Sequence, residues 1–274
     1  MSNIKRCFVS RFGEDGILLE ADFSQLEVVG LAILSGDPIL IDDIRSGKDM
    51  HRLRASELYK KPQETITDEQ RRIAKQLSFQ LQYGAGAASM AATNKIPVAL
   101  AKSFISLYYS RYRVVKAWQD ELAASVIANR RPSLGHTASG MPQGASDYES
   151  PTGRVYRFKE YDGFRGEPSF SPTEMKNYPI QGFATGDVMA VFRGDLFRRL
   201  VEAPAYDVRC VVINSVHDSV MFDCPDWDAV DWISHVLHEL ANELPDKVER
   251  AWGIHCALPF PITIKTGATW ADLS

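Results

Sequence analysis

Strand-like segments lie near both ends of this sequence, and helical patterns fill most of the region between them. Residues 16–23 (GILLEADF) form an apolar run closed by an aspartate and a phenylalanine. Residues 207–224 consist of two apolar runs joined by a polar pair, which predicts a β-hairpin, and residues 260–267 predict a closing strand. A sheet built from both ends of a chain predicts an α+β fold, in which an antiparallel sheet receives a mostly helical insertion.

The clearest helix signal lies in the middle of this insertion. Thr67 and Gln70 form a capping box, in which the threonine hydroxyl accepts from the Gln70 amide and the glutamine side chain reaches back. Ile73, Leu77 and Leu81 follow at helical spacing and predict the buried face. The helix should end near the following Tyr-Gly pair, since glycine suits the left-handed position after a helix.

Other elements are predicted with less pattern to support them. Helices are expected over 27–36, 101–129 and 180–201, and from about residue 226 onward. Residues 131–175 are rich in Gly, Pro and Ser, and we predict loops there, with one short hairpin around PTGRVYRF.

Composition excludes several classes of protein. No apolar run approaches the roughly 18 residues of a membrane span, and the N-terminal segment is too polar for a secretory signal. Cys7, Cys210, Cys224 and Cys256 lack CxxC spacing, which indicates reduced thiols in a cytoplasmic protein. The net charge of −4 provides no general attraction for a polyanion, so binding of nucleic acid would depend on local patches.

Two aspartates are placed where a sheet would fix the backbone and expose the side chain. Asp22 ends the first predicted strand, and Asp218 follows His217 at the tip of the predicted hairpin. Two carboxylates brought together repel each other and attract divalent cations. Two Mg²⁺ ions about 3.5–4 Å apart can activate one oxygen and stabilise another in a phosphoryl displacement.

A second pattern mixes cations and aromatic rings on one helical stripe. Arg71, Lys75, Phe79 and Tyr83 recur every four residues. The cations could neutralise a triphosphate, and a ring could stack on a base. Each part also has an ordinary structural explanation: a strand-end turn, a solvated helix face and a helix C-cap. The joint order of the parts favours function.

Three segments in order resemble the motifs A, B and C of family A DNA polymerases, the DNA polymerase I family. They are DFSQLE (22–27), RRIAKQLSFQLQYG (71–84) and VHDSV (216–220). The segments DMHRLRASELY, KNYPIQGFATGD and KTGATW are similar to further parts of that family, so the resemblance covers nearly the whole chain. The variant FSPTEMKNYPIQG looks most like bacteriophage members.

The resemblance implies template-directed DNA synthesis, in which dNTPs are added to a primer 3′-hydroxyl by two-metal phosphoryl transfer. Asp22 and Asp218 would ligate two Mg²⁺ ions, for which Mn²⁺ can substitute, and the backbone carbonyl of Phe23 would complete one shell. Lys75 would protonate the leaving pyrophosphate.

The resemblance also implies how the substrates are held. The triphosphate would contact His51, Arg71 and Lys75. The sugar and base would contact Phe79, Tyr83, Gln25 and Glu27. Glu27 would close the sugar 2′ position and reject ribonucleotides. The primer–template DNA would contact Asn177, Gln181, His217 and Arg154.

Three departures from the family pattern bear on these expectations. Ser219 stands where motif C usually has glutamate, which resembles single-subunit RNA polymerases, whereas the SQxE segment 24–27 resembles DNA enzymes. Thr173 replaces an arginine of many relatives. Only 21 residues precede Asp22 in this sequence, from which we expect the thumb and the 3′–5′ exonuclease of the family to be supplied elsewhere.

We therefore expect the catalytic half of a split phage replicative polymerase, acting in the cytoplasm of an infected bacterium. A second chain would supply the thumb and an exonuclease, an apolar patch near residues 1–15 would form the joint, and a processivity factor could join them. The palm would comprise residues 1–40 and 176–274, and the fingers residues 41–175. The alternatives are a non-catalytic DNA-binding scaffold and an RNA polymerase or primase-like enzyme.

Overall fold

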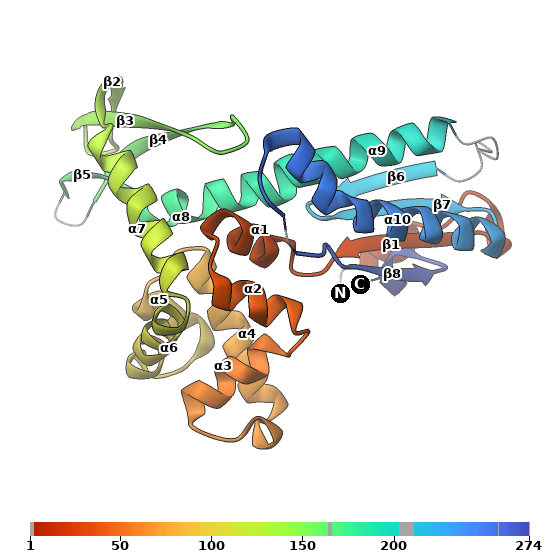
Figure 1. Ribbon diagram of the computed structural model, residues 1–274, viewed down its shortest axis with the longest axis horizontal. Coiled ribbons are helices and arrows are strands. Elements are labelled where there is room, and N and C mark those ends of the chain that lie inside the picture. The colour runs from red at the N-terminus through yellow and green to blue at the C-terminus, as the bar shows by residue number, and fades with distance from the viewer. Residues whose placement is uncertain (1–2, 164–165, 203–210, 257, 274) are drawn as a thin grey trace. The chain divides into compact units, whose positions relative to one another are not determined.

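The computed structural model describes residues 3–163, 166–202, 211–256 and 258–273 (Figure 1). The chain divides into two compact units. Unit 1 comprises Met1–Val29 and Phe183–Ser274, and unit 2 comprises Gly30–Gly182. Both units mix helices with an antiparallel sheet, which confirms the α+β class.

Unit 1 is built on a four-stranded antiparallel sheet in the order β6-β7-β1-β8. Its strands are β1 (Ile17–Phe23), β6 (Val211–Val216), β7 (Ser219–Cys224) and β8 (Ile262–Gly267). The three predicted strand regions are confirmed, although residues 207–210 of the predicted hairpin lie outside the described residues. All of β7 and most of β1 are buried, as expected for the two central strands.

Two long helices accompany this sheet. Helix α10 (Trp227–Trp252) packs on β1, β7 and β8 and alongside α9 (Met189–Glu202), as Figure 1 shows. Asp226 caps α10 by accepting a hydrogen bond from the Ala229 amide at 2.9 Å. The helix expected from about residue 226 onward is confirmed, and Val230, Ile233, Leu237 and Leu240 on one of its faces are buried. Short 3-10 turns occupy Asn3–Cys7, Gly13–Asp15 and Trp270–Leu273.

The helices of unit 2 follow in chain order and include the predicted central one. They are α2 (Pro38–Arg45), α3 (Met50–Tyr59), α4 (Asp68–Gln82), α5 (Ala87–Asn94), α6 (Val98–Arg111), α7 (Arg113–Ala128) and α8 (Pro172–Gln181), with a 3-10 turn at Gln63–Thr65. Helix α1 (Leu26–Ser35) crosses the boundary between the units in sequence. The capping box of α4 is present as predicted, and Leu77 and Leu81 are buried.

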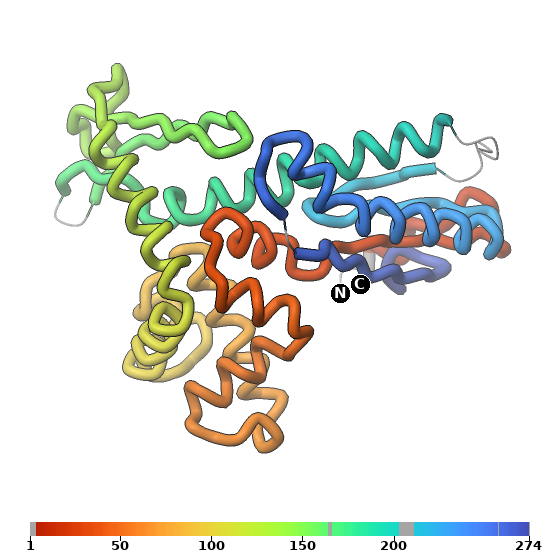
Figure 2. The backbone as a smooth tube through the Cα atoms, viewed as in Figure 1, coloured from red at the N-terminus to blue at the C-terminus, as the bar shows by residue number. Residues whose placement is uncertain are grey.

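The prediction of loops over residues 131–175 was wrong, apart from the short hairpin. Four strands form a sheet in the order β2-β3-β4-β5, and the path from α7 through this sheet into α8 can be followed in Figure 2. They are β2 (Arg131–His136), β3 (Pro142–Glu149), β4 (Val155–Asp162) and β5 (Pro168–Phe170).

Charge on the exposed face explains why this sheet was missed. Asp147 accepts from Arg131 and Arg157 on the two neighbouring strands, so polar residues fill positions that would otherwise show alternation. The buried face of the sheet is small, and its Phe158 and Phe170 pack against side chains of α7 and α8. A sheet with so few apolar residues has little periodicity to read.

The helix predicted over 101–129 is two helices that meet at Tyr112. Tyr112 adopts φ −99° and ψ 70°, which ends the helical path. The helix predicted over 180–201 also begins earlier, at Pro172, with Ser171 as its N-cap. It passes through a π-helical segment, Gly182–Val188, before α9.

One buried carboxylate accounts for the start of α7. Asp37 is 1% exposed and caps α2, with Oδ1 accepting from the Ile39 and Leu40 amides at 3.0 Å. Its Oδ2 accepts from the Val114 and Val115 amides at 3.0 and 3.1 Å, which are the first-turn amides of α7. Four orphan amides of two helices are therefore satisfied by one side chain.

No helix in the described ranges is long and apolar enough to cross a membrane.

Replacing Asp37 with alanine should lower the free energy of unfolding by about 2–4 kcal/mol, because two caps of about 1 kcal/mol each are lost and buried amides are left unpaired. Urea unfolding followed by circular dichroism measures the change. Asp226→Ala removes a single exposed cap and should cost about 1 kcal/mol. Equal costs for the two variants would contradict the double-cap interpretation.

Candidate active site

The sheet of unit 1 brings Asp22 and Asp218 to neighbouring positions. Asp22 on β1 pairs with Ser219, the first residue of β7 and the residue directly after Asp218. The Phe23 amide donates to the Asp218 carbonyl at 3.2 Å, so the hairpin tip is bonded to the end of β1. The strand pairing thus places two carboxylates at one end of one sheet.

The charge of this pair is poorly compensated within unit 1. Burial, together with the nearby carboxylates of Asp218 and Glu20, raises the pKa of Asp22 to about 6, while Lys265 acts in the opposite direction. A carboxyl group with a raised pKa is one whose ionised form lacks stabilising partners. A divalent cation between the two aspartates would supply that stabilisation.

The donors available suit Mg²⁺. The described residues contain no cluster of three or more His, Cys, Asp or Glu side chains that could hold a metal. A site with two carboxylates and a backbone carbonyl, completed by water and substrate oxygens, fits the hard Mg²⁺ ion, which keeps several waters and takes few protein ligands. It does not fit zinc, which prefers a closed set of nitrogen and sulfur ligands.

The turn that carries Asp218 is held by side chains that the sequence did not reveal. His217 adopts a left-handed backbone with φ +51°, and its carbonyl accepts from Arg193 Nη2 of α9 at 2.8 Å. The Ser219 hydroxyl donates to the Val216 carbonyl at 3.1 Å. Ser219 is buried and secures the turn, which is a structural reason for serine at this position.

The start of α1 follows directly on β1 and carries two more predicted residues. Gln25 is exposed and has φ +58°, and its carbonyl accepts from the Val28 and Val29 amides at 2.9 and 3.0 Å. Glu27 lies in the first turn of α1 and is half-buried. The Phe23 ring packs edge-on against Phe192, with ring centroids 4.8 Å apart, which holds the end of β1 against α9.

In unit 2, helices α3 and α4 bring together the residues predicted to bind a nucleotide. Arg71 Nε lies 2.5 Å from Asp49 Oδ2, at the start of α3. Lys75 Nζ lies 5.7 Å from the centroid of the Phe79 ring, and the His51 ring lies 6.0 Å from the same ring. One surface of unit 2 therefore holds two cations, an imidazole and a phenyl ring.

His51 is buried, and its imidazole is neutral. Burial, together with the positive charges of Arg54 and Lys75, lowers the pKa of His51 to about 4. Its Nδ1 has no hydrogen-bond partner in the part of the chain that the structure describes. An unpaired buried polar atom is costly, and a ligand that pairs with it would recover that cost.

Arg54 is a buried cation that gave no sequence signal. It is 4% exposed, donates to Ser78 Oγ at 2.9 Å and lies over the rings of Tyr108 and Tyr112. It joins α3, α4 and α6 and lies one turn from His51 on α3. Its contacts come from three helices, so no spacing within one segment could have predicted them.

The predicted DNA-contacting residues lie in different elements. Asn177 is buried and Gln181 half-buried on α8, whereas Arg154 is exposed in the turn between β3 and β4. These three belong to unit 2 and His217 to unit 1. Tyr83 ends α4 and precedes Gly84, which has φ +75°, and a Cβ at Gly84 would meet the Thr173 Cα at 2.7 Å. Thr173 therefore lies against the end of α4.

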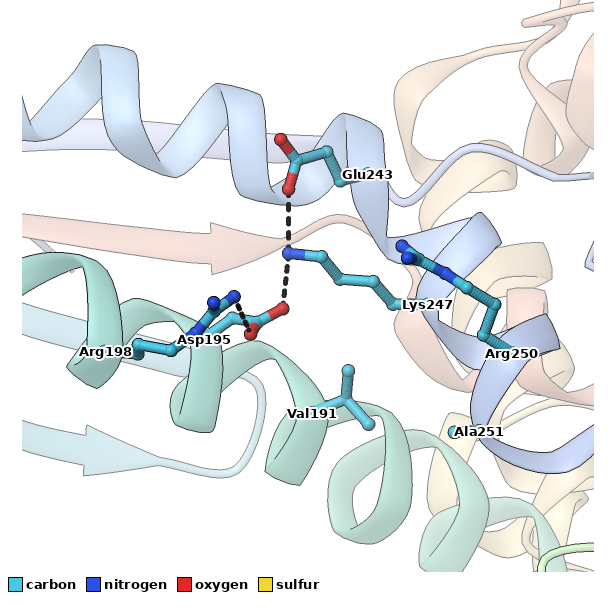
Figure 3. Close-up of a pocket in the computed structure, with 7 residues that line it drawn as sticks. All are labelled: Val191, Asp195, Arg198, Glu243, Lys247, Arg250 and Ala251. Atoms are coloured by element: carbon cyan, nitrogen blue, oxygen red, sulfur yellow. Dashed lines mark hydrogen bonds and ion pairs between the residues drawn. The ribbon is translucent and has the colours of Figure 1, made fainter.

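A pocket of about 620 Å³ between α9 and α10 is a different kind of site (Figure 3). Lys247 lies between the carboxylates of Asp195 and Glu243, and Arg198 pairs with Asp195. None of the predicted site residues is among those that line it. Its charges largely pair with one another, which indicates a helix-to-helix ion network.

Comparison with known proteins identifies the family to which this chain belongs. Residues 1–272 match the model of DNA polymerase family A. The chain is 30% identical over 268 residues to the thermostable DNA polymerase I of Thermus aquaticus, covering 97% of the chain and 28% of that protein. It is 26% identical over 244 residues to the DNA polymerase of Bacillus phage SP01, covering 87% of the chain and 24% of that protein.

A solved structure shares the fold. The POL domain of Pol1 from M. smegmatis, in a complex with DNA primer-template and dNTP, matches with a TM-score of 0.67 and 23% identity, over 98% of this chain and 42% of that one. This chain belongs to the family A DNA polymerases, which confirms the resemblance seen in the sequence. It spans 28% of the length of the Thermus aquaticus relative.

Replacing Asp22 with asparagine should stabilise the metal-free chain at neutral pH. The folded pKa of about 6 exceeds the reference value of 3.8, so the folded chain loses stability as pH rises through about 6. After allowance for solvent screening, the gain should be about 1–2 kcal/mol at pH 7.5 and near zero at pH 4. Urea unfolding in EDTA at both pH values tests this.

The control for this measurement is Asp231→Asn, at an exposed position on α10, which should change stability little at either pH. If Asp22→Asn destabilised the chain at pH 7.5, the ionised Asp22 would be a stabilised group, and the argument for a cation would fail.

Gly182→Ala should lower the free energy of unfolding by about 1–3 kcal/mol, because its Cβ would lie 1.8 Å from the Tyr156 hydroxyl. The matched control is Gly194→Ala on α9, where a Cβ meets nothing within 4 Å. That change should be neutral or stabilising, since alanine favours a helix. Thermal unfolding of both variants tests the difference, and equal melting temperatures would contradict the clash.

Proposed function

We propose that this chain carries the nucleotidyl-transfer core of a DNA-directed DNA polymerase, which adds dNTPs to a primer 3′-hydroxyl. The observation that carries the proposal is the β1–β7 register, which places Asp22 beside the turn of Asp218 in a chain that belongs to family A. Residues 1–40 and 176–274 would form the palm, and residues 41–175 the fingers.

Asp22, Asp218 and the Phe23 carbonyl would hold the metal ions, and Mn²⁺ could replace Mg²⁺. When bound, two Mg²⁺ ions would lower the pKa of the primer hydroxyl and neutralise charge on the leaving pyrophosphate. The hairpin bonds the turn of Asp218 to the end of β1, so the backbone that carries the two carboxylates would be fixed before the substrates bind.

The surface of α3 and α4 would bind the incoming nucleotide. Arg71 and Lys75 would pair with the phosphates, and the neutral His51 would donate a hydrogen bond from its ring. Lys75 Nζ would pass a proton to the departing pyrophosphate oxygen. Phe79 would flank the sugar and base, and Tyr83 would stack beside the templating base.

Residues of other elements would select the sugar and hold the DNA. Gln25 and Glu27 would lie by the sugar, with Glu27 excluding a 2′-hydroxyl. Asn177 and Gln181 would form hydrogen bonds with the acceptor groups in the minor groove of the newly formed duplex. Arg154 and His217 would also contact the primer–template DNA.

We also propose a partner that completes the grip on duplex DNA, supplying a thumb and an exonuclease, with a processivity factor as a further component. The support is a group of exposed apolar residues in unit 1, since Ile4, Phe8 and Val9 are 64%, 52% and 61% exposed. Exposed apolar groups of this kind mark interaction surfaces. The similarity to a phage polymerase supports action in an infected bacterial cell.

The proposal predicts Mg²⁺-dependent primer extension that Asp218→Ala reduces by about 10³-fold or more, since charge stabilisation at the reacting phosphate is lost. The assay uses a labelled primer–template and dNTPs, with the chain alone and with an exonuclease–thumb protein encoded beside it. Asp226→Ala is the control, because it removes a carboxylate from the α10 cap only.

Activity that needs the partner and disappears in Asp218→Ala would support a split polymerase. Full activity and normal DNA affinity of the chain alone would contradict the split arrangement. No extension under any condition, with DNA still bound, would favour the non-catalytic scaffold.

A further inference from the structure

Asp49 lies at the junction of the two helices that carry the proposed phosphate-binding residues. Its Oδ1 accepts from the backbone amides of His51 and Arg52 at 3.1 and 3.0 Å, which caps α3. Its Oδ2 lies 2.5 Å from Nε of Arg71 on α4. One carboxylate therefore contacts the backbone of one phosphate-binding residue and the side chain of another.

Each contact restricts a different degree of freedom. The cap fixes the first turn of α3, and His51 is the second residue of that turn. The bond through Nε fixes the plane of the Arg71 guanidinium while engaging neither Nη group. A guanidinium held at Nε can still present its two Nη groups to an anion as a fork.

The cap alone does not explain an aspartate here. Asparagine and serine cap helices as well as aspartate does. Only a carboxylate also forms a charge-assisted bond with a guanidinium. Burial acts to raise the pKa of Asp49, but the hydrogen bonds from Arg71 and the Arg52 amide outweigh it and hold that pKa below its usual value.

We propose that Asp49 is a positioning residue that orients Arg71 and His51 toward the triphosphate of the incoming nucleotide. This inference rests on the function proposed above. Asp49 does not contact the phosphates itself. It restricts the two side chains before the nucleotide arrives, so less conformational entropy is lost on binding.

A competing interpretation gives the opposite sign. Asp49 could hold Arg71 away from the nucleotide, so that the triphosphate must displace the carboxylate. In that case, removing the charge would tighten nucleotide binding. The sign of the change in dNTP affinity therefore decides between orientation and competition.

Asp49→Asn is the informative variant, because asparagine keeps the cap and removes the charge. The full chain, bound to a primer–template whose primer ends in a 3′-deoxynucleotide, is titrated with dNTP and Mg²⁺ to give an equilibrium Kd. Primer extension gives KM and kcat separately. We expect Kd and KM to rise about tenfold, as for loss of one charge-assisted bond, with kcat changed less than threefold and the melting temperature lowered only slightly, because the cap is kept.

Three further variants separate positioning from stability. Asp49→Ala also loses the cap, so it should show the same rise in KM together with a lower melting temperature. Asp226→Asn changes the cap of α10 in the same way and should leave KM unchanged. In an Arg71→Ala background, Asp49→Asn should have a much smaller effect on KM, because the two residues act through one bond.

An unchanged or lower Kd in Asp49→Asn would overturn the inference while leaving the proposed function intact. Absence of both dNTP binding and extension in the unaltered chain with its partner would overturn the proposed function and this inference with it. The unaltered chain is measured first, so the two failures are distinguishable.

Discussion

Unit 1 is constrained by two like charges, the carboxylates of Asp22 and Asp218, which lie at the same end of one sheet. Antiparallel pairing of β1 with β7 puts Asp22 opposite Ser219, and the bond from Phe23 to the Asp218 carbonyl closes the arrangement. Side chains alternate along a strand, so a slip of one residue would turn Asp22 to the other face. The buried strands and α10 oppose that slip, and the packing offsets the cost of a carboxylate whose pKa is raised by burial and by repulsion from Asp218.

In unit 2 an imidazole has a strongly shifted pKa, and the shift is downward. On α3 the imidazole of His51 stays neutral, because burial and then the positive charges of Arg54 and Lys75 lower its pKa. Unit 1 therefore holds a carboxylate whose ionised form is disfavoured, and unit 2 holds an imidazole whose protonated form is disfavoured.

Local signals gave the strands of unit 1, the capping box at Thr67 and the two aspartates, because strand ends, hairpin tips and caps are encoded by neighbouring residues. Contacts between distant segments could not be read in this way. The start of α7 just after Tyr112 depends on Asp37, which is distant in the sequence. In the β2–β5 sheet, charged residues that pair across the strands occupy positions where apolar and polar residues would otherwise alternate. The hydrogen bond from Arg193 to the His217 carbonyl at the hairpin tip corresponds to no periodic pattern in the sequence.

The two amide pairs bonded to Asp37, Ile39/Leu40 of α2 and Val114/Val115 of α7, belong to helices that are far apart along the chain. Because one carboxylate serves both, fraying of α2 would leave the first turn of α7 with a displaced acceptor, and the reverse also holds. The two helix ends should therefore open together as one cooperative unit rather than as separate frayed termini. The amides in the first turns of α2 and α7 would then exchange with solvent deuterium at rates set by a single shared opening. Motion at the start of α2 and motion at the start of α7 would therefore occur on the same timescale.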